Sequence, residues 1–174
     1  MKKVTYLTES AKKFTKEEAI AEAKRCLLCE EAYCNKRCPI NSNPKEFVKL
    51  VATEQFEKAI KLIRDNNPLF YSICTRVCPY DSYCVGGCRK SALGDNPIMI
   101  PFIQKYLVDY CDASDEVITS DHIQPKKVGQ KVAIIGSGPA GLAAAAVLGQ
   151  KGYEVTVFEA KKEVGGWLSY GIPP

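Results

Sequence analysis

The sequence is poor in several residue types and patterns that often reveal a protein's function. It contains one His, one Trp and two Met in 174 residues. The single histidine, His122, lies in a stretch predicted to be a linker, and we assign it no catalytic role. Basic residues form no run: 24 Lys and Arg are dispersed among 20 Asp and Glu, for a net charge of +4. Nucleic-acid binding therefore has little support.

Signals for secretion and membrane insertion are also missing from the sequence. The first residues, MKKVTYLTESAKKF, are polar and lack the apolar core of a signal peptide, which disfavours a secreted, disulfide-bonded protein. Residues 132–149 are apolar, but Gly136, Ser137, Gly138 and Pro139 interrupt them, which disfavours a membrane span. We therefore expect a cytoplasmic protein that contacts neither membrane nor nucleic acid.

Cysteine, by contrast, is abundant and clustered. Of nine cysteines, all but Cys111 stand in two loops, CLLCEEAYCNKRCP at 26–39 and CTRVCPYDSYCVGGC at 74–88. A helical segment separates these loops, so we expect them to meet in space and share metal. Structural zinc sites pair two short Cys-x-x-Cys motifs around one ion, whereas the first loop places three cysteines within nine residues.

A proline directly after a cysteine also favours iron-sulfur clusters over zinc. In two-cluster ferredoxins the last cysteine of such a run, followed by proline, binds the other cluster. Cys38-Pro39 stands in that position, and Cys78-Pro79 repeats the pair. Eight sulfur atoms are nominally enough for two 4Fe-4S clusters. Structural zinc and paired disulfides remain as less favoured alternatives.

Helices are predicted before, between and after the two loops. Thr15 and Glu18 form a capping box that begins a short helix, which delivers Cys26 and Cys29. The apolar residues expected on one face of this helix are Ile20, Ala23 and Leu27.

Two further helices form a predicted hairpin between the loops. Asn43, Pro44 and Glu46 mark the start of the first, and Thr53 is predicted to cap the second, which ends at Asn66-Asn67-Pro68. Their apolar positions recur at helical spacing and are Phe47, Leu50 and Val51, then Phe56, Ala59, Ile60 and Ile63. After the second loop, another helix begins near Pro101, with apolar positions at Ile103, Tyr106, Leu107 and Tyr110.

The chain changes class near residue 120. Residues 112–130 lose helical periodicity and gain Asp, Ser, Pro and Gly, and we place a linker at 121–130. Residues 1–120 are predicted to form an α-helical domain with two 4Fe-4S clusters. Residues 131–174 are predicted to begin an α/β Rossmann-like FAD-binding domain, with a buried strand, an alanine-rich helix and a second strand ending at Glu159. A doubly wound sheet needs more strands than this, so we expect a longer whole protein.

The glycine motif after the first predicted strand fits a dinucleotide site. Its residues are Gly136, Ser137, Gly138, Pro139, Ala140 and Gly141. In such a motif the first glycine makes the tight turn, the second lets the backbone approach a pyrophosphate, and the third allows close helix packing. Glu159 follows Gly141 by 18 residues, near the spacing of the acid that binds a ribose hydroxyl. FAD and NAD both fit this fingerprint.

Four stretches of the sequence together resemble one family. They are RCLLCEEAYCNKRCP, NNPLFYSICTRVCPYDSYCVGGC, IIGSGPAGLAAAAVL and FEAKKEVGGWLSYGIP. They look like the N-terminal iron-sulfur and FAD region shared by dihydropyrimidine dehydrogenases, including their bacterial flavin and iron-sulfur subunit, and by the glutamate synthase small subunit. The pair Gly165-Gly166 resembles the second glycine pair of FAD-binding flavoproteins and favours FAD. The stretch GGWL, which ends at Leu168, resembles the bacterial dihydropyrimidine dehydrogenase subunit more than it resembles the glutamate synthase subunit.

The resemblance also implies the metal ligands. It assigns Cys26, Cys29, Cys34 and Cys88 to one cluster, and Cys38, Cys78 and Cys84 to the other. The fourth ligand of the second cluster would be Gln104, a position where glutamate synthase-type relatives commonly carry glutamate. Cys74 and Cys111 are left outside both clusters, although Cys74 remains an alternative to Gln104.

What the resemblance implies about function is electron transfer. Reduced nicotinamide, bound by a downstream domain, would give hydride to FAD, and the clusters would pass single electrons to an FMN site that reduces uracil or thymine. The partner would be the FMN-containing pyrimidine-reducing subunit or domain in a hetero-oligomer, or alternatively the glutamate synthase large subunit. A non-enzymatic iron-sulfur electron-transfer module is a further alternative. We predict no catalytic residue in this chain, and no full activity for it alone.

Overall fold

The computed structural model describes residues 13–69, 71–113 and 126–172. These residues form two compact units, 13–113 and 126–172. Several predictions fall outside the described residues: His122, Pro173-Pro174, the N-terminal arm to residue 12, and the predicted linker up to residue 125.

The first helix, α1 (Lys16–Lys24), begins as predicted. The Thr15 hydroxyl accepts from the Glu18 amide at 3.2 Å, and the Glu18 carboxylate accepts from the Thr15 amide at 2.9 Å, so the capping box is complete. The expectation that Leu27 shares the buried face is wrong, because the helix ends at Lys24 and Leu27 is 49% exposed. The chain leaves the helix and passes Leu28 in a left-handed conformation, φ 49°.

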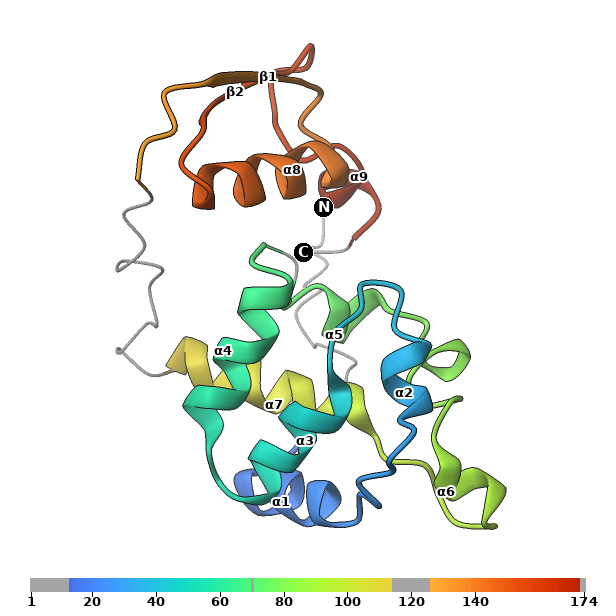
Figure 1. The fold of residues 1–174 in the computed structure, drawn as a ribbon. Coiled ribbons are helices and arrows are strands. Elements are labelled where there is room, and N and C mark those ends of the chain that lie inside the picture. Colours follow the sequence, from blue (N-terminus) through green and yellow to red (C-terminus); the bar gives the residue numbers. More distant parts are fainter. Residues whose placement is uncertain (1–12, 70, 114–125, 173–174) are drawn as a thin grey trace. The chain divides into compact units, whose positions relative to one another are not determined.

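The helical core lies among α1, α3 (Pro44–Ala52), α4 (Phe56–Asn66) and α7 (Ile100–Ala113), which contact one another (Figure 1). The predicted start of α3 is confirmed, since the Asn43 side chain accepts from the Glu46 amide at 3.2 Å and Pro44 occupies the first turn. The fully buried positions include many of those expected from the periodicity: Phe47, Val51, Ala59, Ile60, Ile103 and Leu107.

The prediction that Thr53 caps α4 is wrong. Thr53 instead ends α3, where its hydroxyl donates to the carbonyls of Lys49 and Leu50. Glu54 then adopts φ 57°, and the amides of Glu54 and Gln55 return to the Val51 and Leu50 carbonyls at 3.0 and 2.9 Å. This pair of bonds is a Schellman termination of α3, in which a glutamate takes the left-handed position usually held by glycine.

Short helices lie within the cysteine loops and directly after the second one. The first loop contains α2 (Tyr33–Lys36), and the second contains α5 (Cys74–Val77) and the 3-10 helix η1 (Tyr80–Ser82), with α6 (Arg89–Ala92) directly after it. Only loops were expected here from the sequence. The helix α2 contains Cys34 and α5 contains Cys74, whereas the other cysteines of the two loops lie outside the helices.

The second unit contains β1 (Lys131–Ile135), α8 (Pro139–Gln150), β2 (Glu154–Phe158) and α9 (Trp167–Tyr170). The strands pair in parallel, with Lys131 opposite Glu154 and Ile135 opposite Phe158, and α8 lies along one face of the pair (Figure 1). This is the predicted βαβ unit. The strands are not buried, however: Ile135 is 84% exposed, because among the described residues the sheet has only two strands and one helix covering it.

Candidate functional site: two cysteine-lined cavities and a glycine loop

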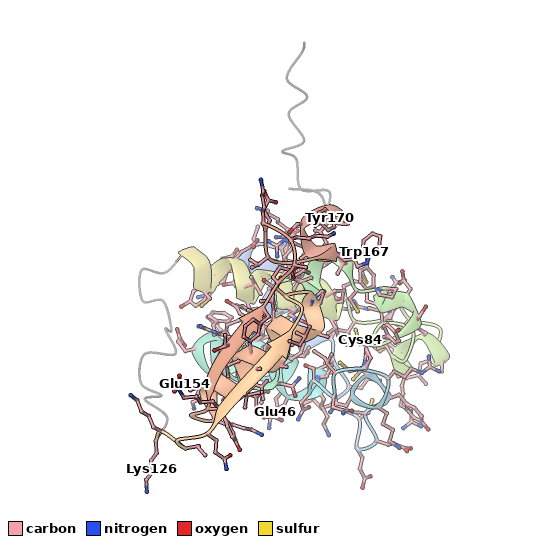
Figure 2. All side chains as sticks on the ribbon, turned by 90° about the horizontal axis from the view of Figure 1, so that it is seen from above. Glu46, Cys84, Lys126, Glu154, Trp167 and Tyr170 are labelled. Carbon is pink, nitrogen blue, oxygen red and sulfur yellow. The ribbon has the colours of Figure 1, made fainter. Side chains whose placement is uncertain are left out.

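Two separate cavities in the helical unit divide the cysteines. The thiols that line the first cavity come from Cys26, Cys29, Cys34 and Cys88. The second cavity is lined by Cys38, Cys74, Cys78, Cys84 and the side chain of Gln104. Figure 2 shows sulfur atoms gathered near the labelled Cys84. Each of the two ligand sets expected from the sequence is therefore brought together around its own cavity.

One layer of side chains separates the cavities. Pro44, at the start of α3, and Ile100, at the start of α7, line both of them. Ile100 is 3% exposed and Pro44 is buried. Apolar side chains therefore lie between the two groups of thiols.

Two cysteines of the first cavity, Cys26 and Cys34, lie in an environment that opposes their ionisation. Burial raises the pKa of the Cys34 thiol to about 11, and the neighbouring Cys26 and Cys88 add to the rise. Burial also raises the pKa of Cys26, while Lys45 acts in the opposite direction. Cys88 Sγ accepts from the Ile98 amide at 3.4 Å. A positive metal core bound among these sulfurs would favour their thiolate forms.

Burial has the same effect on cysteines of the second cavity. Burial raises the pKa of Cys84 to about 12, with added contributions from Cys78 and Cys38. Burial followed by the nearness of Cys38 raises the pKa of Cys78 as well. Cys38, which is followed by Pro39, comes from the first loop and lines this cavity with three cysteines of the second loop, the placement expected of a crossing ligand.

Gln104 occupies the cavity side of α7. Its Nε2 donates to the Tyr71 carbonyl at 3.0 Å. This bond engages the amide nitrogen with the backbone and leaves Oε1 as the atom of this amide suited to bind a metal. The arrangement fits the role expected for Gln104.

Cys74 lies on the same cavity, so it stays an alternative donor. The Asn67 side-chain amide donates to Cys74 Sγ at 3.5 Å, and burial, then Cys78 and Cys38, raise the pKa of this thiol. Cys111 differs: it is 4% exposed within the helical core, where Arg64 donates to its sulfur at 3.9 Å. Cys111 lines neither cavity.

The donor sets suit a polynuclear group better than a single ion. Sulfurs around tetrahedral zinc lie about 3.8 Å apart, given Zn–S distances of ~2.3 Å. Among the described residues, no three or more Cys, His, Asp or Glu side chains are close enough to hold one metal ion. The thiols instead surround cavities, as ligands of a larger core do.

Three cations at the first cavity were not expected from the sequence. Lys45, Arg89 and Lys90 line it together with the cysteines. Arg89 stacks over the Tyr33 ring at 5.5 Å, and Lys90 Nζ lies 2.6 Å from Asp95. Arg89 and Lys90 follow Cys88 directly, which could have suggested them, whereas Lys45 reaches the cavity only because α3 packs beside it.

The glycine loop of the second unit has the geometry that its motif predicts. Gly136 adopts φ 95°, which disfavours any other residue at the turn. A Cβ on Gly141 would lie 2.0 Å from the Gly136 carbonyl oxygen and 3.4 Å from Ile134. The third glycine therefore permits the first turn of α8 to pack against the loop and strand, as expected.

Ser137 joins the other residues predicted to bind the cofactor. It is fully buried, and its hydroxyl and amide both donate to the Glu159 carboxylate. The Gly165 amide donates to the Ser137 carbonyl at 3.0 Å, and Gly166 packs against Gly138. Hydrogen bonds from Ser137, then from the Lys161 amide, lower the pKa of Glu159 to about 2, so this carboxylate is ionised at neutral pH.

The remaining predicted residues of this site lie on the helices that follow the glycine loop and the Gly165-Gly166 turn. Pro139 and Ala140 open α8, and Leu168 lies on α9, where its amide donates to the Gly165 carbonyl at 3.1 Å. The helix α9 itself was not expected. Its Trp167 and Tyr170, labelled in Figure 2, are 76% and 57% exposed.

The described helices include none with the length and hydropathy needed to cross a membrane.

Comparison with known proteins gives two family matches. The model described as dihydropyrimidine dehydrogenase domain II, 4Fe-4S cluster, matches residues 3–116, and the NAD(P)-binding Rossmann-like domain matches residues 134–171. The chain therefore contains a 4Fe-4S domain followed by the start of an NAD(P)-binding Rossmann-like domain.

Individual relatives agree with this division. The NAD-dependent dihydropyrimidine dehydrogenase subunit PreT homolog of Salmonella typhi is 41% identical over 174 residues, which cover 99% of this chain and 41% of the relative. Subunit PreT of Escherichia coli K12 is 41% identical over 175 residues with the same coverage. The NADPH glutamate synthase small chain of Azospirillum brasilense is 36% identical over 161 residues, covering 92% of this chain and 33% of the relative. The chain thus spans about two fifths of the length of the PreT relatives.

Proposed function

Because the chain belongs to the family defined by dihydropyrimidine dehydrogenase domain II, 4Fe-4S cluster, we propose that it is the electron-transfer portion of an NAD(P)H-dependent FAD and iron-sulfur oxidoreductase of the dihydropyrimidine dehydrogenase kind. The observation that carries this proposal is the pair of cavities, each lined by one of the two expected donor sets. Two 4Fe-4S clusters bound there would supply one-electron carriers.

The chain's own residues would bind and shield these carriers. Cys26, Cys29, Cys34 and Cys88 are the proposed ligands in the first cavity. Cys38, Cys78, Cys84 and Gln104 are the proposed ligands in the second. Because Pro44 and Ile100 line both sites, the two carriers would be one side-chain layer apart, which favours transfer of single electrons between them.

The proposed flavin site uses the glycine loop. The amides at the start of α8 and the backbone of Gly138 would face the FAD pyrophosphate, because a helix N-terminus offers unpaired N–H groups and a positive dipole. Glu159, ionised beside Ser137, would accept from the ribose hydroxyls. The turn at Gly165 and Gly166, held to the glycine loop through Ser137, supports FAD over NAD at this place.

The partner and substrate follow from the relatives. We propose a hetero-oligomer in which a partner with FMN reduces the 5,6 double bond of uracil or thymine with electrons from this chain. NAD(P)H would bind to a downstream domain. We further propose a cytoplasmic location, because ligand thiolates must stay reduced. The glutamate synthase large subunit is the second candidate partner, given the 36% identity to a glutamate synthase small chain.

Anaerobic purification of the full-length protein tests the proposal. We expect a brown protein with iron and sulfide near eight atoms each per chain, and FAD released on denaturation. Clusters without any flavin would favour the non-enzymatic electron-transfer module. A colourless protein with stoichiometric zinc would overturn the proposal.

The choice of partner has its own measurement. Full-length protein mixed with each candidate partner is supplied with NAD(P)H and either uracil or the substrates of glutamate synthase. We expect uracil-dependent oxidation of NAD(P)H with the FMN partner. Turnover only with the glutamate synthase large subunit would reverse the choice.

A further inference from the structure

A short irregular segment, residues 95–99, connects α6 to α7 beside the first cavity, and we name it the strap. None of its N–H groups from residue 96 to 99 bonds to backbone: Asn96 donates to Asp95 Oδ1 at 2.7 Å, Ile98 to Cys88 Sγ at 3.4 Å, and Met99 to Glu22 Oε1 at 2.8 Å. Pro97 has no N–H group. Backbone bonds fix the two ends of the strap, from the Asp95 amide to the Lys90 carbonyl and from amides of α7 to the Ile98 and Met99 carbonyls. Between these ends, the amides of Ile98 and Met99 are held by the side chains of Cys88 and Glu22.

The strap's bond to Cys88 is protected from water. Ile98 is 2% exposed and lines the first cavity together with Cys88. An N–H group that donates to a ligand sulfur stabilises negative charge on that sulfur, and hydrogen bonds of this kind are among the factors that set cluster potentials. The distance between Ile98 N and Cys88 Sγ would therefore influence the reduction potential of a cluster bound by Cys88.

An ion pair on α1 holds the strap at both ends. Glu22 accepts from the Met99 amide after Ile98, and Arg25 donates to the Asn96 carbonyl before it at 2.7 Å. Arg25 also bonds Glu22 at 2.7 Å and Asp95 at 3.3 Å. Glu22 is only 13% exposed at its side chain, which strengthens these contacts.

We propose that Glu22 and Arg25 are positioning residues that hold the Ile98 amide on Cys88 Sγ and so raise the reduction potential of the cluster in the first cavity. This inference rests on the proposed function, since it concerns a cluster bound by Cys88. The alternative is a clamp that only joins α1 to the start of α7. Such a clamp would affect stability but not the potential.

Two variants separate these roles because charge and position predict opposite results. Glu22→Ala removes a negative charge, which by Coulomb's law alone would raise the potential. Loss of the strap's anchor predicts a lower potential instead. Arg25→Lys keeps the charge but loses the planar fork that reaches Glu22, Asp95 and Asn96 together. Lys24→Gln is the matched control, since it removes a cation from the same end of α1.

The experiment uses the full-length protein, purified anaerobically, with iron analysis, potentiometric titration followed by electron paramagnetic resonance, and deuterium ENDOR after exchange into D2O. We expect unchanged iron and a more negative potential for the first-cavity cluster in Glu22→Ala and Arg25→Lys. We also expect a weaker coupling to the exchangeable deuteron at Cys88. The second-cavity cluster and the Lys24→Gln protein should match the parent.

The outcomes separate the strap from the proposed function. An unchanged or raised potential in Glu22→Ala, with full iron content, overturns the inference while leaving the clusters in place. If Glu22→Ala loses iron, the Arg25→Lys protein tests the inference in its place. An unchanged potential of the first-cavity cluster in Arg25→Lys would then overturn the inference. A parent protein without iron overturns the proposed function itself.

Discussion

The two cavities are built from the same pair of loops and share a wall, yet their linings differ in charge. The first combines four thiols with Lys45, Arg89 and Lys90. The second has thiols and the neutral amide of Gln104, and of the described residues that line it none is charged.

This difference matches the charge that each proposed donor set would create. A 4Fe-4S core of about +2 carries about −2 with four thiolates and about −1 with three thiolates and an amide. The site proposed to be more negative is lined by the three cations, of which Lys90 also pairs with Asp95, and no described residue that lines the other site is charged. Uncompensated charge in a buried site is costly, so the lining supports Gln104 over Cys74 as the fourth donor of the second cavity.

The largest effect is expected from removing one thiolate from each cavity in turn. Cys34→Ser and Cys84→Ser should each lose about four of eight iron atoms per chain, because a cubane with a weakened ligand is released. Electron paramagnetic resonance should show that different clusters remain. If both variants lose the same signal, the division into two donor sets is wrong.

A smaller effect is expected when the donor of the second cavity is changed. Gln104→Cys should retain both clusters and add about one negative charge, which lowers the potential of the second-cavity cluster by on the order of 100 mV. The first-cavity cluster serves as an internal control in the same titration. Titrations in which Gln104→Cys and Gln104→Ala both reproduce the parent would remove Gln104 from the ligand set.

Removing a cation from the first cavity should have a weaker effect. Lys45→Gln should lower the potential of the first-cavity cluster by on the order of tens of millivolts, because a partly exposed cation is screened. Lys49→Gln, on the exposed side of the same helix, is the matched control. Equal shifts in both variants would mean that the charge acts at long range and not as part of the lining.

The smallest effect on iron is expected at the cysteines outside the donor sets. Cys74→Ser and Cys111→Ser should both keep about eight iron atoms per chain. Cys111→Ser should still lower the free energy of unfolding by about 1–3 kcal/mol, because it places a hydroxyl in the apolar core. Loss of four iron atoms from Cys74→Ser alone would make Cys74 the ligand and Gln104 a bystander.

Cysteine spacing predicted that the two loops would meet around metal, because short spacings and a following proline limit how a loop can present its sulfurs. The family resemblance, and not the spacing, predicted which cysteines share a cavity, and it left Cys74 outside the second set. The buried residues of α3, α4 and α7 were equally predictable, because apolar residues at helical spacing form one face that packs into the core. Gln104 was expected only by resemblance, as glutamine has no pattern that marks it as a ligand.

The missed features depend on tertiary packing or on single dihedral angles. Thr53 looked like an N-cap, and only the left-handed conformation of Glu54 made it the end of α3. Lys45 and the strap residue Ile98 reach the first cavity through contacts between distant elements. The exposure of Ile135 reflects how few strands the described sheet contains.

The hairpin of α3 and α4 between the cysteine loops has a consequence for the unfolded chain. Each proposed cluster takes sulfurs from both loops, so each would act as a crosslink that closes the hairpin. Closing a loop of about 50 residues removes conformational entropy worth about 4 kcal/mol from the unfolded state, if a cluster acts as a disulfide does. The second closure lies within a chain already constrained by the first and therefore adds less. A protein that has lost one cluster would thus keep most of this restraint and could be refilled without refolding.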